Sequence, residues 1–379
     1  MRRQPVPVVR AGVATAALVA ALAGCSSTQA SKAIAVTGTD TTCTPATSTL
    51  SAGTVELQFD NKGTKVSELY VLRSDGSIVT EKEDVAPGVT ARVTVELPAG
   101  SYTLQCKPGM TGDGIKAPLT VTAAQGAAAV PAASADPRLA NAVTAYRTYV
   151  AGESASSLAL AKQLTAAVRA GDVARAEALY APSRIGWERV EPVAESFGDL
   201  DPRIDARQAD LAEGETWSGW HVLEKGLWTT NSTKGLAPVA ATLVKDLEDL
   251  VARVPKAEIT PTSMANGANE LLDEVAKGKI TGEEEAFSHT DLMDMQANVE
   301  GARKVVDLLA PVLSEKDSAL KASLDQRFTQ LQALLGKHRA KDGFASYETV
   351  TQEQRRTISA AVDALSEPLS KVAAAVLAR

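Results

Sequence analysis

Residues 123–137 read AAQGAAAVPAASADP, an alanine-rich stretch with two prolines and no hydrophobic periodicity. This composition is typical of a linker, since it offers neither a helix nor a strand a face to bury. The sequence pattern differs on its two sides. Residues before it alternate between apolar and polar, whereas residues after it repeat their apolar positions every three to four residues. We therefore place a linker at residues 124–137, between a β-domain and a helical domain.

The segment 33–123 is expected to form a small β-sandwich. Alternating apolar and polar residues predict strands within TVELQFDNKG (54–63), SELYVLRSDGSIV (67–79), TARVTVELPAGSYTLQC (90–106) and APLTVTA (117–123). The stretch 67–79 breaks at Ser74-Asp75-Gly76 like a hairpin, and the stretch 90–106 divides into two strands around Pro98-Ala99-Gly100. Short strands separated by turns over about ninety residues are typical of a sandwich.

The segment 138–379 is expected to be all-α. Asp136 and Pro137 suit the cap and the first turn of its opening helix. Helical spacing of apolar residues marks seven segments: 138–154, 173–190, 236–254, 266–276, 289–313, 316–337 and 353–377. Their lengths suit an antiparallel bundle, or two bundles side by side.

The N-terminus predicts export and a lipid anchor. Arg2 and Arg3 form a short basic stretch ahead of the apolar run AGVATAALVAALAG (11–24), which is too short for a comfortable membrane span. Small residues then lead directly to Cys25, as in the lipobox of bacterial lipoproteins. We expect a signal peptide at residues 1–24, a lipid on Cys25, and a tether at residues 25–32 that holds the protein at the cell membrane, outside the cytoplasm. The alternative is a plain secretory signal followed by an incidental cysteine.

The charge of the chain argues against a nucleic-acid partner. The formal net charge is −7, and the segment 1–24 contributes three arginines and no acid. The mature chain would therefore carry 36 basic against 46 acidic residues, whereas nucleic-acid binding needs clustered cations. An acidic balance fits a protein that handles cations, but it also fits any soluble exported protein.

The stretch YTLQCKPGMTGDGIKAPLTV (102–121) resembles the C-terminal metal-binding loop of cupredoxins, with Cys106 as the thiolate and Met110 as the axial ligand. Residues 1–220 contain no histidine, and a blue-copper centre needs two imidazoles, so type-1 copper electron transfer is not expected. Two alternatives stay open. Cys43, Glu68, Cys106 and Met110 form a different metal site, or the two cysteines form a disulfide with Met110 in the core, which is the default for an exported protein.

The helical segment holds a second candidate site in WSGWHVLEKGLW (217–228), which contains three of the four tryptophans of the chain. The i, i+3 spacing places His221 and Glu224 on one helix face, within reach of one ion. Helix bundles build metal sites from such pairs and from glutamates on facing helices. The tryptophans would form an apolar surface that excludes water and so strengthens charge interactions with the ion. The alternative is a surface ion pair above an aromatic core.

Nearby acids are the expected partners of this pair. Glu188 and Glu195 lie on either side of Pro192, which kinks or ends a helix, so we expect them to converge on the site from both sides of a bend. Oxygen donors suit ferric iron, and mixed nitrogen and oxygen donors suit ferrous iron. Further candidates, as ligands, supporting partners or solvated groups, are Asp210, His289, Asp291 and Asp294.

Three strings of the chain resemble the EfeO family of periplasmic or lipid-anchored iron-uptake proteins. They are ERVEPVAESFGDLDPRIDAR (188–207), WSGWHVLEKGLW (217–228) and FSHTDLMDMQANVEGA (287–302). The resemblance implies a cupredoxin-like domain followed by an imelysin-type, peptidase-like helical domain of two four-helix bundles, with a metal site in its cleft that uses His221 and Glu224. It also implies that Cys43, Glu68, Cys106 and Met110 lie where this family is thought to hold copper or iron. The implied partners are a membrane iron permease and a haem peroxidase-like protein.

The leading hypothesis is an extracytoplasmic iron-binding component that delivers iron to a permease and is not an enzyme. Its helical domain would hold iron through Glu188, Glu195, Glu224 and His221. One alternative is a metallopeptidase, although zinc peptidases need two imidazoles one turn apart, and His289 on a distant segment is the available second one. Another is a structural or polysaccharide-binding lipoprotein that uses its tryptophans as a platform.

Overall fold

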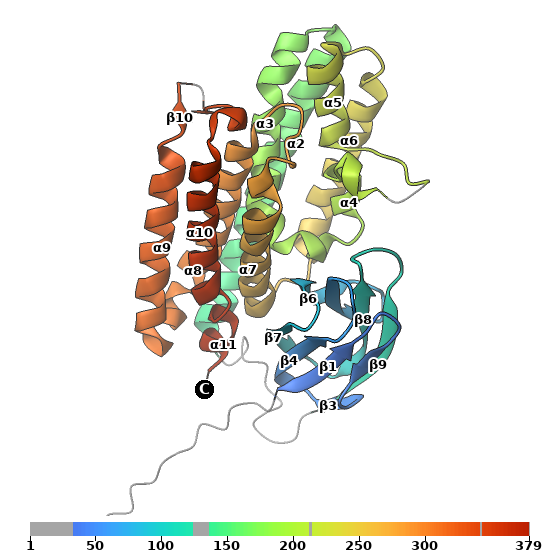
Figure 1. The fold of residues 1–379 in the computed structure, drawn as a ribbon, viewed down its shortest axis with the longest axis vertical. Coiled ribbons are helices and arrows are strands. Elements are labelled where there is room, and N and C mark those ends of the chain that lie inside the picture. Colours follow the sequence, from blue (N-terminus) through green and yellow to red (C-terminus); the bar gives the residue numbers. More distant parts are fainter. Residues whose placement is uncertain (1–32, 124–135, 212–213, 342, 379) are drawn as a thin grey trace, which may run out of the picture.

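The computed structural model describes residues 33–123, 136–211, 214–341 and 343–378. The predicted signal peptide, the lipid site at Cys25, the tether and residues 124–135 of the linker lie outside these residues. The described chain forms a β-domain followed by a helical domain, as predicted (Figure 1). Within the described residues, no helix is both long enough and apolar enough to cross a membrane.

The β-domain is a sandwich of two sheets. One sheet has the strand order β2-β1-β4-β7 and the other β3-β9-β8-β5-β6. Side chains that alternate along β4, such as Val55, Leu57 and Phe59, fill the core between the sheets. The strands are β1 (Ile34–Gly38), β2 (Cys43–Pro45), β3 (Thr49–Ser51), β4 (Gly53–Asn61), β5 (Ser67–Arg73), β6 (Ile78–Val85), β7 (Thr90–Leu97), β8 (Gly100–Pro108) and β9 (Ile115–Thr122).

The two cysteines of the β-domain form a disulfide across this core. Cys43 on β2 and Cys106 on β8 belong to different sheets, and their sulfurs are bonded. Because a disulfide sulfur is not a thiolate, the predicted metal site with Cys43 and Cys106 as ligands is wrong, and the disulfide alternative is correct. Glu68 Oε2 lies 3.4 Å from Lys107 Nζ. Met110 is half-buried in the loop after β8, with a φ of 58°, rather than in the core.

The helical domain consists of two four-helix bundles, as the family resemblance implied. Helices α2, α3, α5 and α6 form one bundle, α7 to α10 form the other, and α8 packs against α2 and α3 to join them (Figure 1). The helices are α2 (Pro137–Ala170), α3 (Val173–Val190), α4 (Leu200–Ile204), α5 (Trp220–Thr230), α6 (Ala237–Arg253), α7 (Pro261–Lys277), α8 (Asp291–Lys316), α9 (Ser318–Gly336), α10 (Gln352–Leu369) and α11 (Val372–Leu377). The short elements are the 3-10 turns η2 (Glu191–Phe197), η3 (Gln208–Asp210), η4 (Val254–Lys256), η5 (Lys279–Thr281) and η6 (Tyr347–Thr349), and the strands β10 (Arg339–Ala340) and β11 (Gly343–Phe344).

Two glycines allow the close backbone contacts that position the functional residues. Gly219 precedes α5 with a φ of 89°, and a Cβ there would lie 2.2 Å from the carbonyl oxygen of Ile204. Gly267 lies where α7 crosses η2, and a Cβ there would lie 1.7 Å from the carbonyl oxygen of Pro192. Any side chain at either position would push these segments apart.

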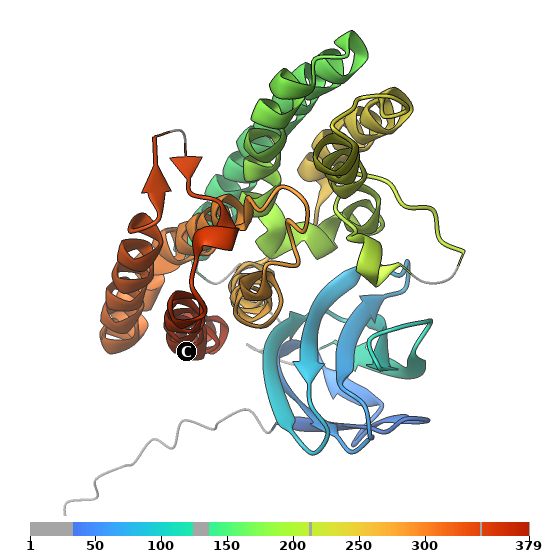
Figure 2. The same ribbon diagram turned by 45° about the horizontal axis from the view of Figure 1, so that its top comes forward.

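The β-domain docks against α7 through polar contacts (Figures 1 and 2). Lys82 on β6 lies 2.9 Å from both Glu270 Oε1 and Asp273 Oδ2. Asn266 Nδ2 donates to Thr80 Oγ1 at 3.1 Å and to the Thr94 carbonyl oxygen at 2.8 Å. The interface therefore joins the edge of the sandwich to the helix that also borders the candidate site.

Candidate metal centre

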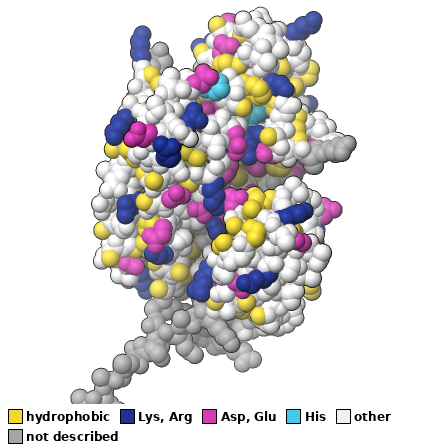
Figure 3. Space-filling view, viewed as in Figure 1, with side chains coloured by type: hydrophobic (Ala, Val, Ile, Leu, Met, Phe, Trp, Pro, Cys, Tyr) yellow, Lys and Arg dark blue, Asp and Glu magenta, His cyan; other side chains and the backbone are white. Residues whose placement is uncertain are grey.

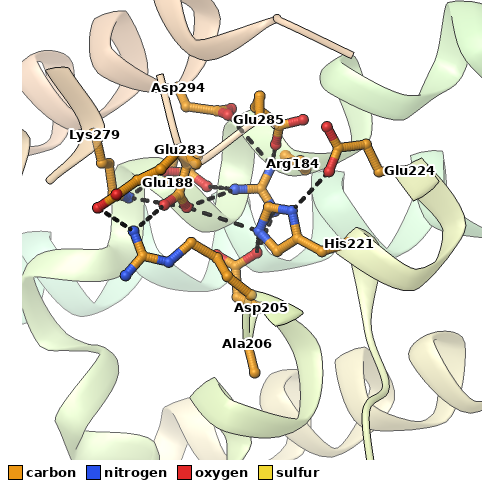
Figure 4. A network of polar contacts seen from close by, with 12 residues as sticks. Arg184, Glu188, Asp205, Ala206, His221, Glu224, Lys279, Glu283, Glu285 and Asp294 are labelled. Atoms are coloured by element: carbon orange, nitrogen blue, oxygen red, sulfur yellow. Dashed lines mark hydrogen bonds and ion pairs between the residues drawn. The ribbon is translucent and has the colours of Figure 1, made fainter. Parts of the chain in front are cut away.

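A buried network of charged side chains lies among α3, α5 and the segment that leads into α8 (Figure 4). Arg184 of α3 lies at its centre, with no exposed side-chain surface. Its guanidinium pairs with five carboxylates: Glu188 at 2.5 Å, Glu285 at 2.8 Å, Glu284 at 3.3 Å, Asp294 at 3.5 Å, and Asp205. Lys279 adds a second buried cation, 3.1 Å from Glu188 and 2.9 Å from Glu191. The acids outnumber the bases, so the network favours an additional cation or bound protons.

His221 lies at the edge of this network with both ring nitrogens next to carboxylates. Nδ1 lies 3.1 Å from Glu224 Oε2, whereas Nε2 lies 3.4 Å from Asp205 Oδ1 and 3.8 Å from Glu284 Oε1. The other oxygen of Glu224 accepts the backbone N–H groups of Phe287 and Ser288, each at 2.8 Å. Glu224 is thus fixed in place as the acceptor for Nδ1–H, which leaves Nε2 as the nitrogen available to an ion.

The electrostatics of the network divide its acids into two classes. Burial opposes ionisation of Asp205, but the Arg184 charge and the His221 hydrogen bond lower its pKa below the usual range. Burial likewise opposes ionisation of Glu284, yet the charges of Lys279 and His221 lower its pKa. By contrast, burial raises the pKa of Glu285 to about 8 and that of Asp294 well above its usual value. Asp205 and Glu284 are therefore anionic at neutral pH, as is Glu224, where burial opposes ionisation but the His221 hydrogen bond lowers the pKa.

The imidazole of His221 carries an extra proton at neutral pH, which a metal ion at Nε2 would have to displace. Burial and the nearby Arg184 charge lower its pKa, but hydrogen bonds to Asp205 and Glu224 outweigh both and raise the pKa to about 10. Metal binding at Nε2 therefore releases a proton, so affinity should rise with pH.

Two groups of potential ligands share His221, and within each group the ligand atoms lie within 4.8 Å of one another. The first group is Asp205, His221 and Glu284, and the second is His221, Glu224 and Glu285. One imidazole serves one of these sites at a time. The orientation of Glu224 and the ionised state of Asp205 and Glu284 favour the first group, with Glu224 as the residue that orients the ring.

Two of the four tryptophans in the predicted apolar surface, Trp187 and Trp220, lie beside the network and belong to the core. Trp187 and Trp220 have no exposed surface. Trp187 Nε1 donates to Asp205 Oδ2 at 2.7 Å, and Trp220 Nε1 donates to Ser183 Oγ at 2.9 Å. These contacts exclude water from one side of the ligands, which strengthens charge interactions there.

Comparison with known proteins agrees with this arrangement of domains. The imelysin family model matches residues 142–372, and a cupredoxin-like domain model matches residues 12–121. The chain is 39% identical to "Iron uptake system component EfeO" of Escherichia coli (strain K12) over 345 residues, which is 89% of this chain and 90% of the relative. The proteins of the same name from Shigella flexneri and Escherichia coli O157:H7 match to the same extent. The chain belongs to the EfeO family. Its two-domain organisation is that of the family.

In this EfeO-family chain, the structure brings some predicted site residues together and separates others. Glu188, His221, Glu224 and Asp294 lie in the one network. Asp291 lies at the start of α8, where its Oδ1 accepts the backbone N–H of Glu285. His289 lies apart from the network, with Nε2 3.5 Å from Glu348.

The predicted convergence of Glu195 with Glu188 is wrong in the contacts observed. The 3-10 segment η2 follows Val190, and Val193 within it has non-helical angles, so Glu195 does not continue the α3 face that carries Glu188. Glu195 lines a cavity at the domain boundary instead, as does Asp210, which pairs with Arg207 at 2.6 Å.

Sequence reasoning missed Arg184, Asp205, Glu284 and Glu285 as members of the site. A weak signal existed for Arg184, which stands four residues before Glu188, the spacing of a helical ion pair. Glu284 and Glu285 belong to a run of three glutamates, and Asp205 lies within a string that carried the family resemblance. Nothing in the linear sequence indicated that these segments meet at His221.

A cavity of about 320 Å³ connects the network with the β-domain. Figure 3 shows acidic side chains gathered where the two domains meet. Arg207 is the basic residue among the described residues that line the cavity. Its acids come from both domains and include Asp205 and Glu284 at the His221 end: Glu81, Glu83, Glu191, Glu195, Asp201, Asp205, Asp210, Glu215, Glu270, Glu274 and Glu284.

Because carboxyl groups of the acidic cavity have raised pKa values, we expect the metal-free protein to lose stability as pH rises. Burial and the nearby Glu68 raise the pKa of Glu83 to about 8 and that of Glu195 to about 7. Because these folded-state pKa values exceed the ordinary value of 4.5, the stabilisation is complete below pH 4.5 and is lost as pH rises through 7 and 8. With a chelator present, we expect a lower melting temperature at pH 8.5 than at pH 5.5, by about 2–4 °C for each kcal/mol lost.

Glu195→Gln tests this prediction, and Glu367→Gln is its matched control. Glu195→Gln should reduce the pH-dependent fall in melting temperature, since an amide does not ionise. Glu367 is exposed and paired with Lys371, so Glu367→Gln should leave the fall unchanged. An equal effect of the two variants would contradict the assignment to the cavity.

Proposed function

We propose that this protein is the extracytoplasmic iron-binding component of an iron uptake system and that it holds iron at His221, between Asp205 and Glu284. The observation that carries the proposal is the His221 ring, which Glu224 fixes so that Nε2 faces two ionised carboxylates. Mixed nitrogen and oxygen donors suit ferrous iron, and additional carboxylates suit ferric iron. The surplus of buried acids supplies the charge that a divalent or trivalent ion neutralises.

The acidic cavity supports a role in capturing cations from solution. Carboxylates from both domains line it up to Asp205 and Glu284. Clefts lined by charge of one sign concentrate ions of the opposite sign and speed their association. In this proposal the β-domain contributes Glu81 and Glu83 to the route by which iron reaches His221.

The site supports binding rather than peptide hydrolysis. Each potential ligand group among the described residues contains one histidine, whereas zinc peptidases of the His-Glu-x-x-His type use two. Glu224 accepts two backbone N–H groups and faces His221 Nδ1, so it is not free to serve as a general base. Trp187 and Trp220 are buried and offer no platform for a polysaccharide, whereas Trp217 and Trp228 are partly exposed.

The relatives named above are components of an iron uptake system, which supports a role within a larger assembly. In this proposal the chain is held at the cell membrane through Cys25 and passes iron to a membrane permease. A haem peroxidase-like protein is the third member of the system.

Replacement of His221 should remove the iron site. With a chain of residues 33–379, calorimetric titration with anaerobic Fe(II), and with Fe(III) supplied as citrate, should give a tight site in the wild type. Loss of a supporting residue typically costs 10- to 100-fold in metal affinity, so loss of a direct ligand in His221→Ala should weaken binding by at least about 100-fold. Glu224→Gln, which disturbs the orientation of the ring, should weaken binding by about 10- to 100-fold.

The other two histidines provide the control. His289→Ala and His338→Ala should leave the dissociation constant unchanged, because neither residue belongs to a potential ligand group. The proposal fails if the wild type binds no iron, or if His221→Ala binds it as tightly as the control variants do.

A further inference from the structure

Arg184 contacts all three residues of the favoured ligand group. Its Nη1 lies 3.5 Å from His221 Nε2 and pairs with Asp205, and its Nη2 lies 3.3 Å from Glu284 Oε1. The guanidinium thus neutralises the two carboxylates that, with His221, form the favoured ligand group. A metal ion and Arg184 therefore compete for Asp205 and Glu284.

Arg184 cannot release Asp205 and Glu284 by losing its proton. A guanidinium stays charged at any pH that a protein tolerates, unlike an imidazole or an amine. Arg184 is also fully buried, and its guanidinium carbon lies 5.6 Å from the centre of the Trp220 ring. It must therefore shift within the network to other acids, since moving unpaired into an apolar interior would cost several kcal/mol.

The network contains two further acceptors for the displaced guanidinium, Glu285 and Asp294. Arg184 Nε lies 2.8 Å from Glu285 and 3.5 Å from Asp294. Asp294 is fully buried, and neither of its oxygens has a hydrogen-bond partner among the described residues. A short rotation of the Arg184 side chain would give Asp294 the hydrogen bonds that it lacks.

We propose that Arg184 competes with the transported metal ion for the carboxylates of Asp205 and Glu284. In the metal-free protein it pairs with Asp205 and Glu284, and on metal binding it moves to Glu285 and Asp294. This inference rests on the proposed function at His221. Exchange of one cation for another keeps Asp205 and Glu284 neutralised in both states, so the site can release its ion without leaving these two carboxylates unpaired. Arg184 thereby lowers affinity and speeds release, as delivery to a permease requires.

The test compares Arg184→Gln with Lys279→Gln in chains of residues 33–379. Lys279 is an equally buried cation that contacts Glu188, Glu191 and Glu284 but not Asp205. Removal of Arg184 should tighten Zn(II) and Fe(II) binding at least tenfold and slow release to a chelator by a similar factor. Lys279→Gln should change both values less, because it does not touch Asp205. Weaker or unchanged binding in Arg184→Gln, or an equal gain in the two variants, would overturn the inference.

A second measurement covers the case in which Arg184→Gln does not fold. In a crystal structure of the zinc-loaded wild type, the Arg184–Asp205 pair should be broken and the guanidinium should lie against Asp294. An intact Arg184–Asp205 pair beside a bound ion would overturn the inference while leaving the metal site at His221 in place. A wild type that binds no metal would overturn both the inference and the proposed function.

Discussion

Asp205→Ala should lower the free energy of unfolding of the metal-free protein by about 3–5 kcal/mol, as removal of one partner from a buried ion pair typically does. Asp205 pairs with Arg184 and lies 3.4 Å from His221 Nε2, and its Oδ2 accepts the indole N–H of Trp187 at 2.7 Å. Alanine would leave the Trp187 indole N–H without an acceptor, and it would remove one of the carboxylates that neutralise Arg184. Urea unfolding followed by tryptophan fluorescence measures the loss.

Asp210→Ala is the matched control for this prediction. Asp210 pairs with Arg207 at 2.6 Å, but its side chain is 48% exposed. Removal of an exposed pair should cost less than about 1 kcal/mol. If Asp205→Ala is as mild as Asp210→Ala, the buried network does not stabilise the helical domain in the way its geometry indicates.

Loss of the disulfide should have a similarly large effect on the β-domain. The bond joins residues 63 positions apart, and a loop of this length corresponds to about 4 kcal/mol of stabilisation in the chain-entropy account. The double variant Cys43→Ser/Cys106→Ser should therefore unfold at a much lower denaturant concentration than the wild type. Cys106 has no exposed surface, so the introduced hydroxyl adds to the loss.

Reducing agent supplies the control for the disulfide. It should destabilise the wild type about as much as the double variant is destabilised, and it should have no effect on the variant itself. Titration of thiols in the unfolded, unreduced protein should find neither Cys43 nor Cys106 free. If two thiols react there, or if reductant does not change the stability of the wild type, the disulfide is absent. Cys43 and Cys106 would then again be candidate metal ligands.

Local pattern was sufficient to predict most of the fold. The helix predicted at 173–190 has the same ends in the structure, because Asp172 caps its start and Pro192 lies just beyond its end. The turn at 74–76 joins β5 and β6 as a hairpin, whereas the turn at 98–100 carries the chain from β7 in one sheet to β8 in the other. Strands β1, β2 and β3 were not predicted; β2 and β3 have three residues each, too few to show alternation.

The site was predicted in part, for a physical reason. His221 and Glu224 were found because both lie on one helix, where spacing determines which residues share a face. Asp205 and Glu284 come from segments whose approach depends on tertiary packing, including the Gly219 contact with Ile204. Glu195 was misplaced because a proline predicts a bend but not the rotation that follows it.

The central claim is that iron binds on the Nε2 side of His221. The most direct measurement is anomalous diffraction at the iron absorption edge from crystals of the iron-loaded protein. The account predicts an iron peak bonded to His221 Nε2, with oxygens of Asp205 and Glu284 among its other ligands and Glu224 on the opposite side of the ring. A peak in the interdomain cavity that has no contact with His221, or one bonded to Nδ1 together with Glu224, would contradict it.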